Sequence, residues 1–298
     1  MRTPPEISVV INNFNYARFL PEAIESALNQ TRKPAEIILV DDGSTDGSQD
    51  FVKSAYGSRV TLIESANFGQ LNALKLGITA ASSPFVALLD ADDRWRPDHL
   101  SAVAEVLHTN PEVNFVIANN TKFGDAEGIG YSITQNEDYG YTTLAGLTRE
   151  WLGAPTSCLV IAKQHLQFLN ALPQGLMAKW KTRADDVIIY GAAISGARKY
   201  RLAKPTVEYR IHGKNLFQGQ SRAVTKSAAY EEQREELLRA LNEHAFPGLN
   251  NAQIIARELS RNTLRKYRNR RNLVRSIWAS HSTFLSRLRL TTAVYFKS

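Results

Sequence analysis

Two clusters of carboxylates follow short apolar segments in the first third of the sequence. The segment "IILV" leads into Asp41 and Asp42, and the segment "FVALL" leads into Asp90, Asp92 and Asp93. Three carboxylates within four residues repel one another strongly in a poorly solvated cleft. A divalent cation relieves this repulsion, and carboxylate oxygens suit Mg²⁺ or Mn²⁺. Because residues two apart in an extended segment point the same way, Asp90 and Asp92 can reach one ion and the phosphates that it carries.

Each cluster also has a structural interpretation. Asp and Ser residues in "DDGSTDGS" form turns and can cap the helix predicted to begin near Ser48. Asp93 can cap the helix predicted within "RPDHLSAVAEVL". Turn formation does not explain why the acid is doubled at Asp41 and Asp42. We therefore interpret the two clusters as parts of one ligand site, with turn and capping residues beside it.

The elements that position these acids are short β-branched segments that alternate with helical ones. The predicted strands are residues 6–11, 35–40, 59–64, 85–90 and 114–119. The predicted helices are residues 20–30, 48–56, 70–81 and 97–108. Continuous apolar strands that alternate with helices predict an α/β fold, with a mostly parallel central sheet flanked by helices. Such sheets bind ligands beyond the carboxyl ends of their strands, which is where both acidic clusters lie.

Composition divides the chain into two parts. Residues 257–297 contain eleven Lys or Arg and one acid, which gives this segment a charge of +10. Because the whole chain has a net charge of +7, residues 1–256 carry a net charge of −3. We therefore predict a catalytic domain at residues 1–220 and a basic helical C-terminal extension at residues 221–298. The single cysteine, Cys158 in "TSCLVIA", excludes an intramolecular disulfide and is expected in a buried strand.

Six motifs, in this order and spacing, resemble the family 2 glycosyltransferases of the GT-A fold. They are "SVVINNFNYARFLPEAIESALNQT", "IILVDDGSTDGS", "NFGQLNALKLGI", "FVALLDADD", "ADDVIIYGAAISG" and "VEYRIHGKN". The resemblance covers about residues 7–215. It implies a GT-A (Rossmann-like) domain and an enzyme of the hexosyltransferase type that uses a nucleotide-diphosphate sugar, usually a UDP-sugar.

The resemblance also implies which residues bind the donor. Asp42 corresponds to the acid that accepts a hydrogen bond from the base, and uracil N3–H is a suitable donor. Residues at the end of the first strand line the same pocket. The residues predicted to contact the nucleotide sugar are Asn12, Phe14, Asn15, Asp42, Gln70 and Asp90.

A metal site of the Asp-x-Asp type follows from the same resemblance. Asp92 corresponds to the ligand of Mn²⁺ or Mg²⁺, and Asp90 is placed toward the ribose or the metal shell. His212 in "YRIHGKN" is a further candidate ligand or phosphate contact; its alternative role is a hydrogen bond that fixes a loop. The metal would neutralise the diphosphate as it leaves.

A third pair of acids, Asp185 and Asp186, precedes an apolar segment predicted to be a helix. Either acid can act as an N-cap. The resemblance implies that Asp186 is the general base that deprotonates the acceptor hydroxyl, which makes the transfer inverting. The helix dipole keeps an acid at this position ionised, as both roles require.

The extension reads as an amphipathic helix, "AAYEEQREELLRALNEHAF", followed by one or two basic helices. The basic helices either pack against the catalytic domain or a second copy, or adsorb to an anionic membrane. The resemblance implies a glycan or a lipid-linked acceptor, and such acceptors favour a peripheral membrane location.

No stretch reaches the roughly 18 apolar residues that a spanning helix needs, and the N-terminal segment lacks the apolar core of a signal peptide. We therefore expect a cytoplasmic protein. The sequence argues against two other functions. A nucleotidyltransferase would bring a Gly- and Lys/Arg-rich phosphate loop near the first strand, which "INNFNYARF" lacks. The net acidic charge of residues 1–256 argues against nucleic-acid binding.

Overall fold

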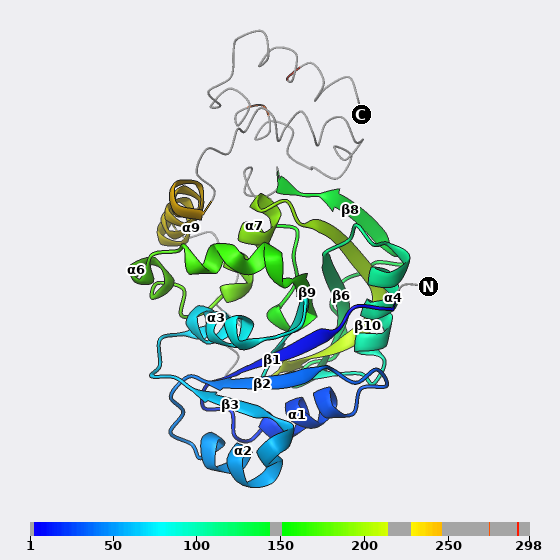
Figure 1. Cartoon of the computed structure of the whole chain (residues 1–298), viewed down its shortest axis with the longest axis vertical. Coiled ribbons are helices and arrows are strands. Elements are labelled where there is room, and N and C mark those ends of the chain that lie inside the picture. The colour runs from blue at the N-terminus through cyan, green and yellow to red at the C-terminus, as the bar shows by residue number, and fades with distance from the viewer. Residues whose placement is uncertain (1–2, 144–150, 214–227, 246–273, 275–290, 292–298) are drawn as a thin grey trace.

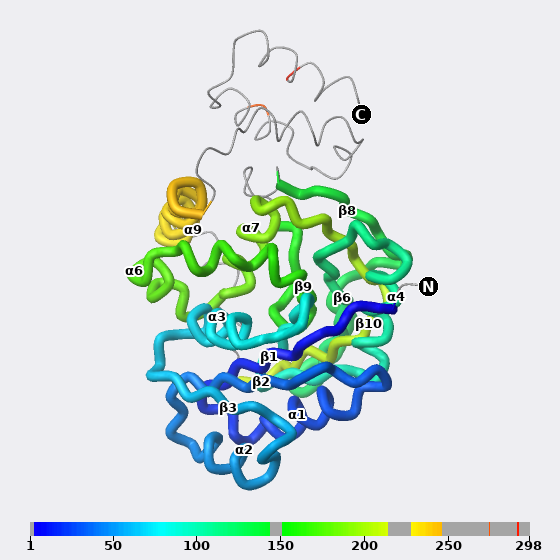
Figure 2. The backbone as a smooth tube through the Cα atoms, viewed as in Figure 1, coloured from blue at the N-terminus to red at the C-terminus, as the bar shows by residue number. Residues whose placement is uncertain are grey.

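The computed structural model describes residues 3–143, 151–213, 228–245, 274 and 291. Helices pack on both faces of one large sheet (Figures 1 and 2). The strands are β1 (Ile7–Asn13), β2 (Glu36–Asp41), β3 (Thr61–Glu64), β4 (Phe85–Asp90), β5 (Arg94–Trp95), β6 (Phe115–Gly124), β7 (Gly128–Ile129), β8 (Glu137–Tyr141), β9 (Leu159–Ala162) and β10 (Arg198–Ile211). The α-helices are α1 (Leu20–Leu28), α2 (Ser48–Tyr56), α3 (Gln70–Ala80), α4 (His99–Thr109), α6 (Gln174–Met177), α7 (Ala184–Ile194) and α9 (Ala228–Ala240).

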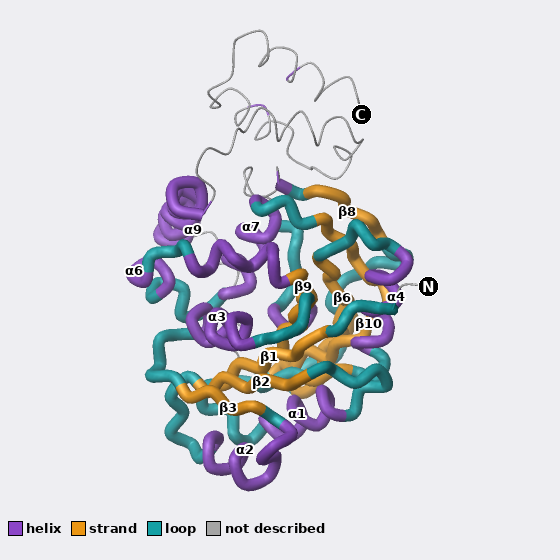
Figure 3. The backbone as a smooth tube through the Cα atoms, in the orientation of Figure 1, coloured by secondary structure: helices purple, strands orange, loops and turns teal. Residues whose placement is uncertain are grey.

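Short helical turns complete the described elements. They are the 3-10 segments Gly57–Arg59, Thr156–Cys158 and Lys163–Asn170, and the π-helical turn Leu241–Ala245. Figure 3 shows how strands, helices and loops alternate along the backbone. None of the described helices is both long enough and apolar enough to cross a membrane.

The first half of the sheet is parallel, as predicted. Strand β1 pairs with β2 on one side and β4 on the other, and β2 pairs with β3. Apart from Asn12, every residue of β1 is buried, because helices cover both faces of these strands. The predicted strands and helices of this half lie close to their observed positions. Helix α1 begins with Pro21 in its first turn, where the missing N–H of proline costs no hydrogen bond.

The second half of the sheet is mixed. The strand order is β3-β2-β1-β4-β9-β6-β10-β5, with β7 beside β6 and β8 beside β10. Strand β9 runs antiparallel to both β4 and β6, whereas β6 and β10 are parallel. The prediction of a mostly parallel sheet thus describes β3-β2-β1-β4 and the β6–β10 pair but misses the direction of β9. A run of apolar residues indicates a buried strand and carries no information about its direction.

The helices α7 and α9 lie over the half of the molecule that faces the carboxyl ends of β1 and β4 (Figure 1). Ten of the eleven α7 residues are buried, and Asp185 is the exception. Helix α9 contributes Tyr230, Leu237 and Ala240 to the hydrophobic core that also contains β1. The predicted domain boundary at residue 221 therefore does not separate α9 from the catalytic body. The basic segment 257–297 lies outside the described residues, except for residues 274 and 291.

Candidate active site

A cavity of about 910 Å³ lies beyond the carboxyl ends of β1, β2 and β4. Its wall also includes the loop before α3, the start of α7 and one side of α9. The predicted site residues that line this cavity are Asn12, Phe14, Asn15, Asp42, Gln70, Asp90 and Asp92. His212 and Asp186 are not among the lining residues. The fold therefore brings most of the predicted nucleotide and metal contacts to one place.

The doubled acid at the end of β2 has two different surroundings. Asp41 is fully buried and accepts hydrogen bonds from the Asn13 amide at 2.6 Å, the Ser44 backbone N–H at 2.8 Å and the Gln49 amide at 2.8 Å. These bonds tie the end of β1, the turn after β2 and helix α2 to one carboxylate. Asp41 thus builds the loop, while Asp42 reaches the cavity.

Asp42 holds the loop on the opposite wall. Its carboxylate accepts the backbone N–H groups of Phe68 at 2.9 Å and Gly69 at 2.7 Å. Each carboxylate oxygen can accept two hydrogen bonds, so both retain capacity for a ligand. Asp42 is therefore a fixed acceptor in the cavity, held by two backbone donors.

The end of β1 joins this wall through Asn15. The backbone N–H of Asn15 donates to the Ser44 hydroxyl at 2.8 Å, and its side-chain oxygen accepts the Thr45 N–H at 2.8 Å. Asn15 adopts φ = 56°, a left-handed conformation that asparagine tolerates better than most residues. Phe14 beside it is 42% exposed and lines the cavity, which leaves its ring available for a flat ligand.

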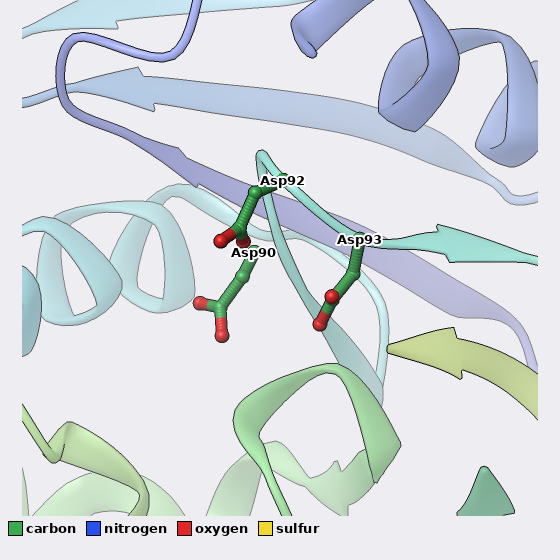
Figure 4. A group of neighbouring side chains, drawn as sticks. All are labelled: Asp90, Asp92 and Asp93. Carbon is green, nitrogen blue, oxygen red and sulfur yellow. The ribbon is translucent and has the colours of Figure 1, made fainter. Parts of the chain in front are cut away.

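Three acids meet after β4. The carboxylate oxygens of Asp90, Asp92 and Asp93 include a set that lies within 4.8 Å of one another (Figure 4). Asp93 is engaged by protein groups, because it accepts the Ser157 hydroxyl at 2.6 Å and the Arg210 backbone N–H at 2.8 Å. Asp93 was expected to cap a helix, but it instead accepts buried hydrogen bonds from Ser157 and Arg210. Asp90 and Asp92 line the cavity.

Burial makes this cluster electrostatically unfavourable. Burial and then the charge of Asp92 raise the pKa of Asp90 to about 7. Burial also raises the pKa of Asp92, and the neighbouring His212 opposes that rise. No Lys or Arg forms an ion pair with Asp90 within the described part of the chain. The oxygen ligands, their proximity and their uncompensated charge all fit a hard divalent cation held by Asp90 and Asp92.

His212 lies next to the predicted metal ligand. Its Nε2 is 3.1 Å from Asp92 Oδ2, and its ring packs on Phe19 with a centroid distance of 4.8 Å. The same Asp92 is held from its backbone side, where its carbonyl accepts the Arg210 Nε–H at 2.7 Å. In this geometry His212 contacts the carboxylate, as do groups that orient a metal ligand. His212 therefore lies beside the predicted metal ligand, and its two alternative roles, ligand or loop-fixing hydrogen bond, stay predictions.

Gln70 connects the metal end of the cavity with the start of α7. Its amide nitrogen donates to Asp90 Oδ1 at 3.0 Å, and its side-chain oxygen accepts the Ala184 N–H at 3.2 Å. The backbone N–H of Gln70 also donates to the Lys181 carbonyl at 3.0 Å. Gly69 allows this approach, since a Cβ on it would lie 2.7 Å from the Cα of Lys181. The loop before α3 thus touches both ends of the site.

The acids at the start of α7 face different environments. Asp185 lines the cavity, whereas Asp186 is fully buried outside the lining. Asp186 Oδ2 accepts Arg183 Nε–H and the Tyr230 hydroxyl, each at 2.6 Å. Neither acid is the N-cap, which is Arg183 in a left-handed conformation. The predicted base, Asp186, is therefore enclosed in protein contacts, and its neighbour occupies the cavity position.

The pKa of Asp185 reflects that position. Burial and then the negative charge of Asp186 raise it to about 8, Arg183 opposes the rise, and Asp90 adds to it. A carboxylate with a raised pKa is a stronger base than an ordinary one, and it can act as a base only in the fraction of molecules in which it has lost its proton. Asp185 therefore has both the location and the basicity of a general base.

Sequence reasoning missed most of the lining at the α7–α9 end. The additional lining residues there are Tyr131, Trp151, Lys181, Arg183, Tyr190, Tyr209, Tyr230 and Arg234. Tyr230 and Arg234 come from the amphipathic helix assigned to the extension, and their spacing of four places them on one helix face.

Known proteins match both the sequence and the fold. The sequence model of "Glycosyl transferase family 2" matches residues 8–168, more than half of the chain. The chain belongs to this family. An uncharacterized glycosyltransferase of Nostoc sp. is 36% identical over 231 residues, which are 75% of this chain and 70% of the relative. The glycosyltransferase GlyG of Streptococcus pneumoniae is 30% identical over 142 residues, 47% of each chain, so the match spans about half of that relative.

Solved structures agree on the fold of this glycosyltransferase. S. aureus TarS 1–349 in complex with UDP-GlcNAc has a TM-score of 0.59 at 15% identity, and covers 92% of this chain and 81% of its own. The same protein in complex with UDP has a TM-score of 0.58 at 16% identity, with 97% and 89% covered. At such identities the likeness shows the GT-A fold alone. The family match ends at residue 168, so α7 and α9 of the glycosyltransferase lie beyond it.

Proposed function

We propose that this glycosyltransferase moves a sugar from a nucleotide-diphosphate donor to a hydroxyl of a glycan or lipid-linked acceptor, with inversion at the anomeric carbon. The observation that carries the proposal is that Asp42, Asp90, Asp92 and Asp185 line one cavity of about 910 Å³. They supply an acceptor for a base N–H, two ligands for a cation, and a base for the attacking hydroxyl. A volume of this size suits a ligand larger than a monosaccharide.

The donor is proposed to be a UDP-sugar. TarS, whose fold this chain shares, was crystallised with UDP and with UDP-GlcNAc. In this chain, the two backbone bonds to Asp42 leave lone pairs for uracil N3–H, and Phe14 provides a face for the ring. Asn12 and Asn15 complete this wall, and Gln70 lines the cavity beside Asp90, to which its amide nitrogen donates.

Mn²⁺ or Mg²⁺ is the proposed cofactor, held by Asp92 and Asp90 with His212 beside Asp92. When bound, such an ion neutralises charge on the diphosphate leaving group. The protein contributes the fixed geometry. Ser157 accepts the Asp90 backbone N–H at 3.0 Å and donates to Asp93, while Arg210 Nε–H binds the Asp92 carbonyl. These contacts keep both ligands in place before the donor arrives.

The general base is proposed to be an acid at the start of α7. The sequence resemblance favours Asp186, and the lining of the cavity favours Asp185, which has a raised pKa and faces the site. Asp186 already accepts two hydrogen bonds on one oxygen and has no exposed surface. We therefore propose Asp185 as the base and assign Asp186 to holding the turn that carries it.

The acceptor end is proposed to bind a sugar ring. Tyr131, Trp151 and Tyr209 line the cavity, and aromatic faces pack well against the apolar faces of sugars. The basic segment 257–297 would provide attachment to an anionic membrane on the cytoplasmic side if the acceptor is lipid-linked. Contact with a second copy is the alternative use of that segment.

A matched pair of isosteric variants tests the function and its base. UDP release from UDP-GlcNAc and other UDP-sugars is followed with Mn²⁺, with water or soluble oligosaccharides as acceptors. Asp185→Asn should lower turnover by about 10²–10⁴, the usual contribution of general-base catalysis. Its binding of UDP and Mn²⁺ should be retained. Asp186→Asn should retain more turnover, because its role is indirect.

The outcomes separate the alternatives. A large loss confined to Asp186→Asn would return the base to Asp186. Equal turnover in both variants and the wild type would place the base elsewhere in the cavity. Failure of the wild type to bind any nucleotide diphosphate, with or without Mn²⁺, would contradict the proposed donor.

A further inference from the structure

Helix α9 is attached to the segment that leads into α7 by several polar contacts. Gln233 Nε2 donates to the Lys179 carbonyl at 2.9 Å, and the Lys179 ammonium lies 2.7 Å from both carboxylate oxygens of Glu236. Leu237 is fully buried in the common core. Helix α9 therefore has a defined position relative to the active site, although the family match ends 60 residues before its first residue, Ala228.

Tyr230 is the α9 residue that reaches the acids of α7. Its hydroxyl donates to Asp186 Oδ2 at 2.6 Å, and its ring packs edge-on against the buried Trp180 with a centroid distance of 6.3 Å. The Arg183 guanidinium carbon lies 4.9 Å from the centre of the same ring. Burial, together with the charge of Asp186, keeps the pKa of Tyr230 far above its ordinary value. The hydroxyl thus remains a proton donor at any working pH.

The backbone at Arg183 has a conformation that few residues adopt without support from their surroundings. Arg183 has φ = 62° and ψ = 38°, and it is the N-cap of α7. Non-glycine residues hold such conformations where the surroundings enforce them, commonly at functional sites. Here the Asp186 carboxylate receives Arg183 Nε–H and the Tyr230 hydroxyl on the same oxygen. This contact fixes the first turn of α7, in which Asp185 directly precedes Asp186.

We propose that Tyr230 is a positioning residue for sugar transfer: it holds Asp186 and Arg183 so that Asp185 faces the donor. This inference rests on the proposed function. It makes α9 part of the active site, although neither the six motifs nor the family match includes it. Tyr230 acts through Asp186, so the effect of its hydroxyl should disappear when Asp186 can no longer accept the bond.

Four variants test the proposal: Tyr230→Phe, Asp186→Ala, the double variant, and Tyr200→Phe as a control that removes a hydroxyl outside the cavity. Turnover of UDP-sugars with Mn²⁺ is measured with KM for the donor and with the affinity for UDP. Tyr230→Phe should lower kcat by about tenfold, since small displacements of a catalytic group are costly. Its donor KM and UDP affinity should remain close to those of the wild type.

The double variant distinguishes positioning from general support. Tyr230→Phe should cost little in the Asp186→Ala background, because alanine offers no acceptor to the tyrosine hydroxyl and coupled residues are not additive. Amide hydrogen exchange supplies a readout that needs no turnover: Tyr230→Phe should accelerate exchange at residues 184–187 and leave β1 and β4 unchanged. Wild-type kcat in Tyr230→Phe, an undiminished effect in the double variant, or unchanged exchange at 184–187 would each overturn the inference. A wild type that binds no UDP would instead overturn the proposed function.

Discussion

The two ends of the cavity are built on different principles. At the donor end each acid follows a strand directly, and neighbouring loops hold it by short bonds such as those from Asn13 to Asp41 and from Ser157 to Asp93. At the acceptor end the acids begin a helix, and the groups that hold them come from the preceding turn and from a helix 44 residues later in the chain. Both ends therefore depend on contacts between distant segments, but at the donor end the register of the parallel strands also fixes where the acids lie.

This difference suggests how such an enzyme can change its acceptor while keeping its donor. The parallel strands β1, β2 and β4 fix the relative positions of Asp42, Asp90 and Asp92 through their backbone register. The acceptor wall depends instead on side chains of α7 and α9, which can be replaced without altering the strands. Three predictions test whether the two ends are as separable as this arrangement implies.

The largest effect is expected from the metal ligand. Asp92→Asn should remove the stabilisation of the UDP complex by Mn²⁺ and reduce turnover by about 10²–10³, since metal assistance contributes several kcal/mol. Asp125→Asn, an exposed acid outside the cavity, is the matched control. Thermal unfolding with UDP, with and without Mn²⁺, measures the first effect. Full turnover in excess chelator would contradict the metal role.

A smaller effect is expected at the base-binding acid. Loss of a hydrogen bond to a charged group costs about 1.5–3 kcal/mol, so Asp42→Asn should weaken UDP binding about ten- to a hundredfold. Asp50→Asn, on the exposed side of α2, should have no effect. Calorimetric titration with UDP, GDP and ADP measures both affinity and base preference. If ADP binds the wild type best, Asp42 does not recognise uracil.

The smallest effect concerns pH and couples the two acids of α7. With a pKa of about 8 for Asp185, kcat/KM of the wild type should rise with pH up to about pH 8, because the base must lose its proton. The charge of Asp186 contributes to that raised pKa, so Asp186→Asn should move the inflection to lower pH. The ratio of the activity at pH 6 to the activity at pH 9 should then be several-fold higher in Asp186→Asn than in the wild type. An inflection that stays in place, or that disappears, would indicate that Asp185 is not the titrating base.

The sequence was sufficient for the donor half. Continuous apolar strands and turn-forming loops identified the strands and helices, and the acid clusters together with the family resemblance identified seven of the residues that line the cavity. The direction of β9 could not be predicted, because a buried strand has the same apolar pattern whether it runs parallel or antiparallel to its neighbours. Asp41 was recognised as unusual, but its role depends on Gln49 and Asn13, which approach it only in the folded chain.

The acceptor half was predicted less well for a related reason. Asp185 and Asp186 are adjacent, and their opposite orientations are decided by Arg183 and Tyr230. The left-handed backbone of Arg183 has no signature in the sequence, since arginine rarely adopts it. For α9, the four-residue spacing of Tyr230 and Arg234 was visible, but the face they share could have met solvent, a membrane or the catalytic body.

One glycine sets the distance between the two ends. Gly69 has φ = 96°, donates its N–H to Asp42 and lies against the backbone of Lys181. A methyl group there would collide with the Lys181 Cα at 2.7 Å, so the chain would have to separate the two segments. Gly69 therefore fixes the spacing between Asp42 and the segment that leads into α7, and a single added carbon atom would widen it.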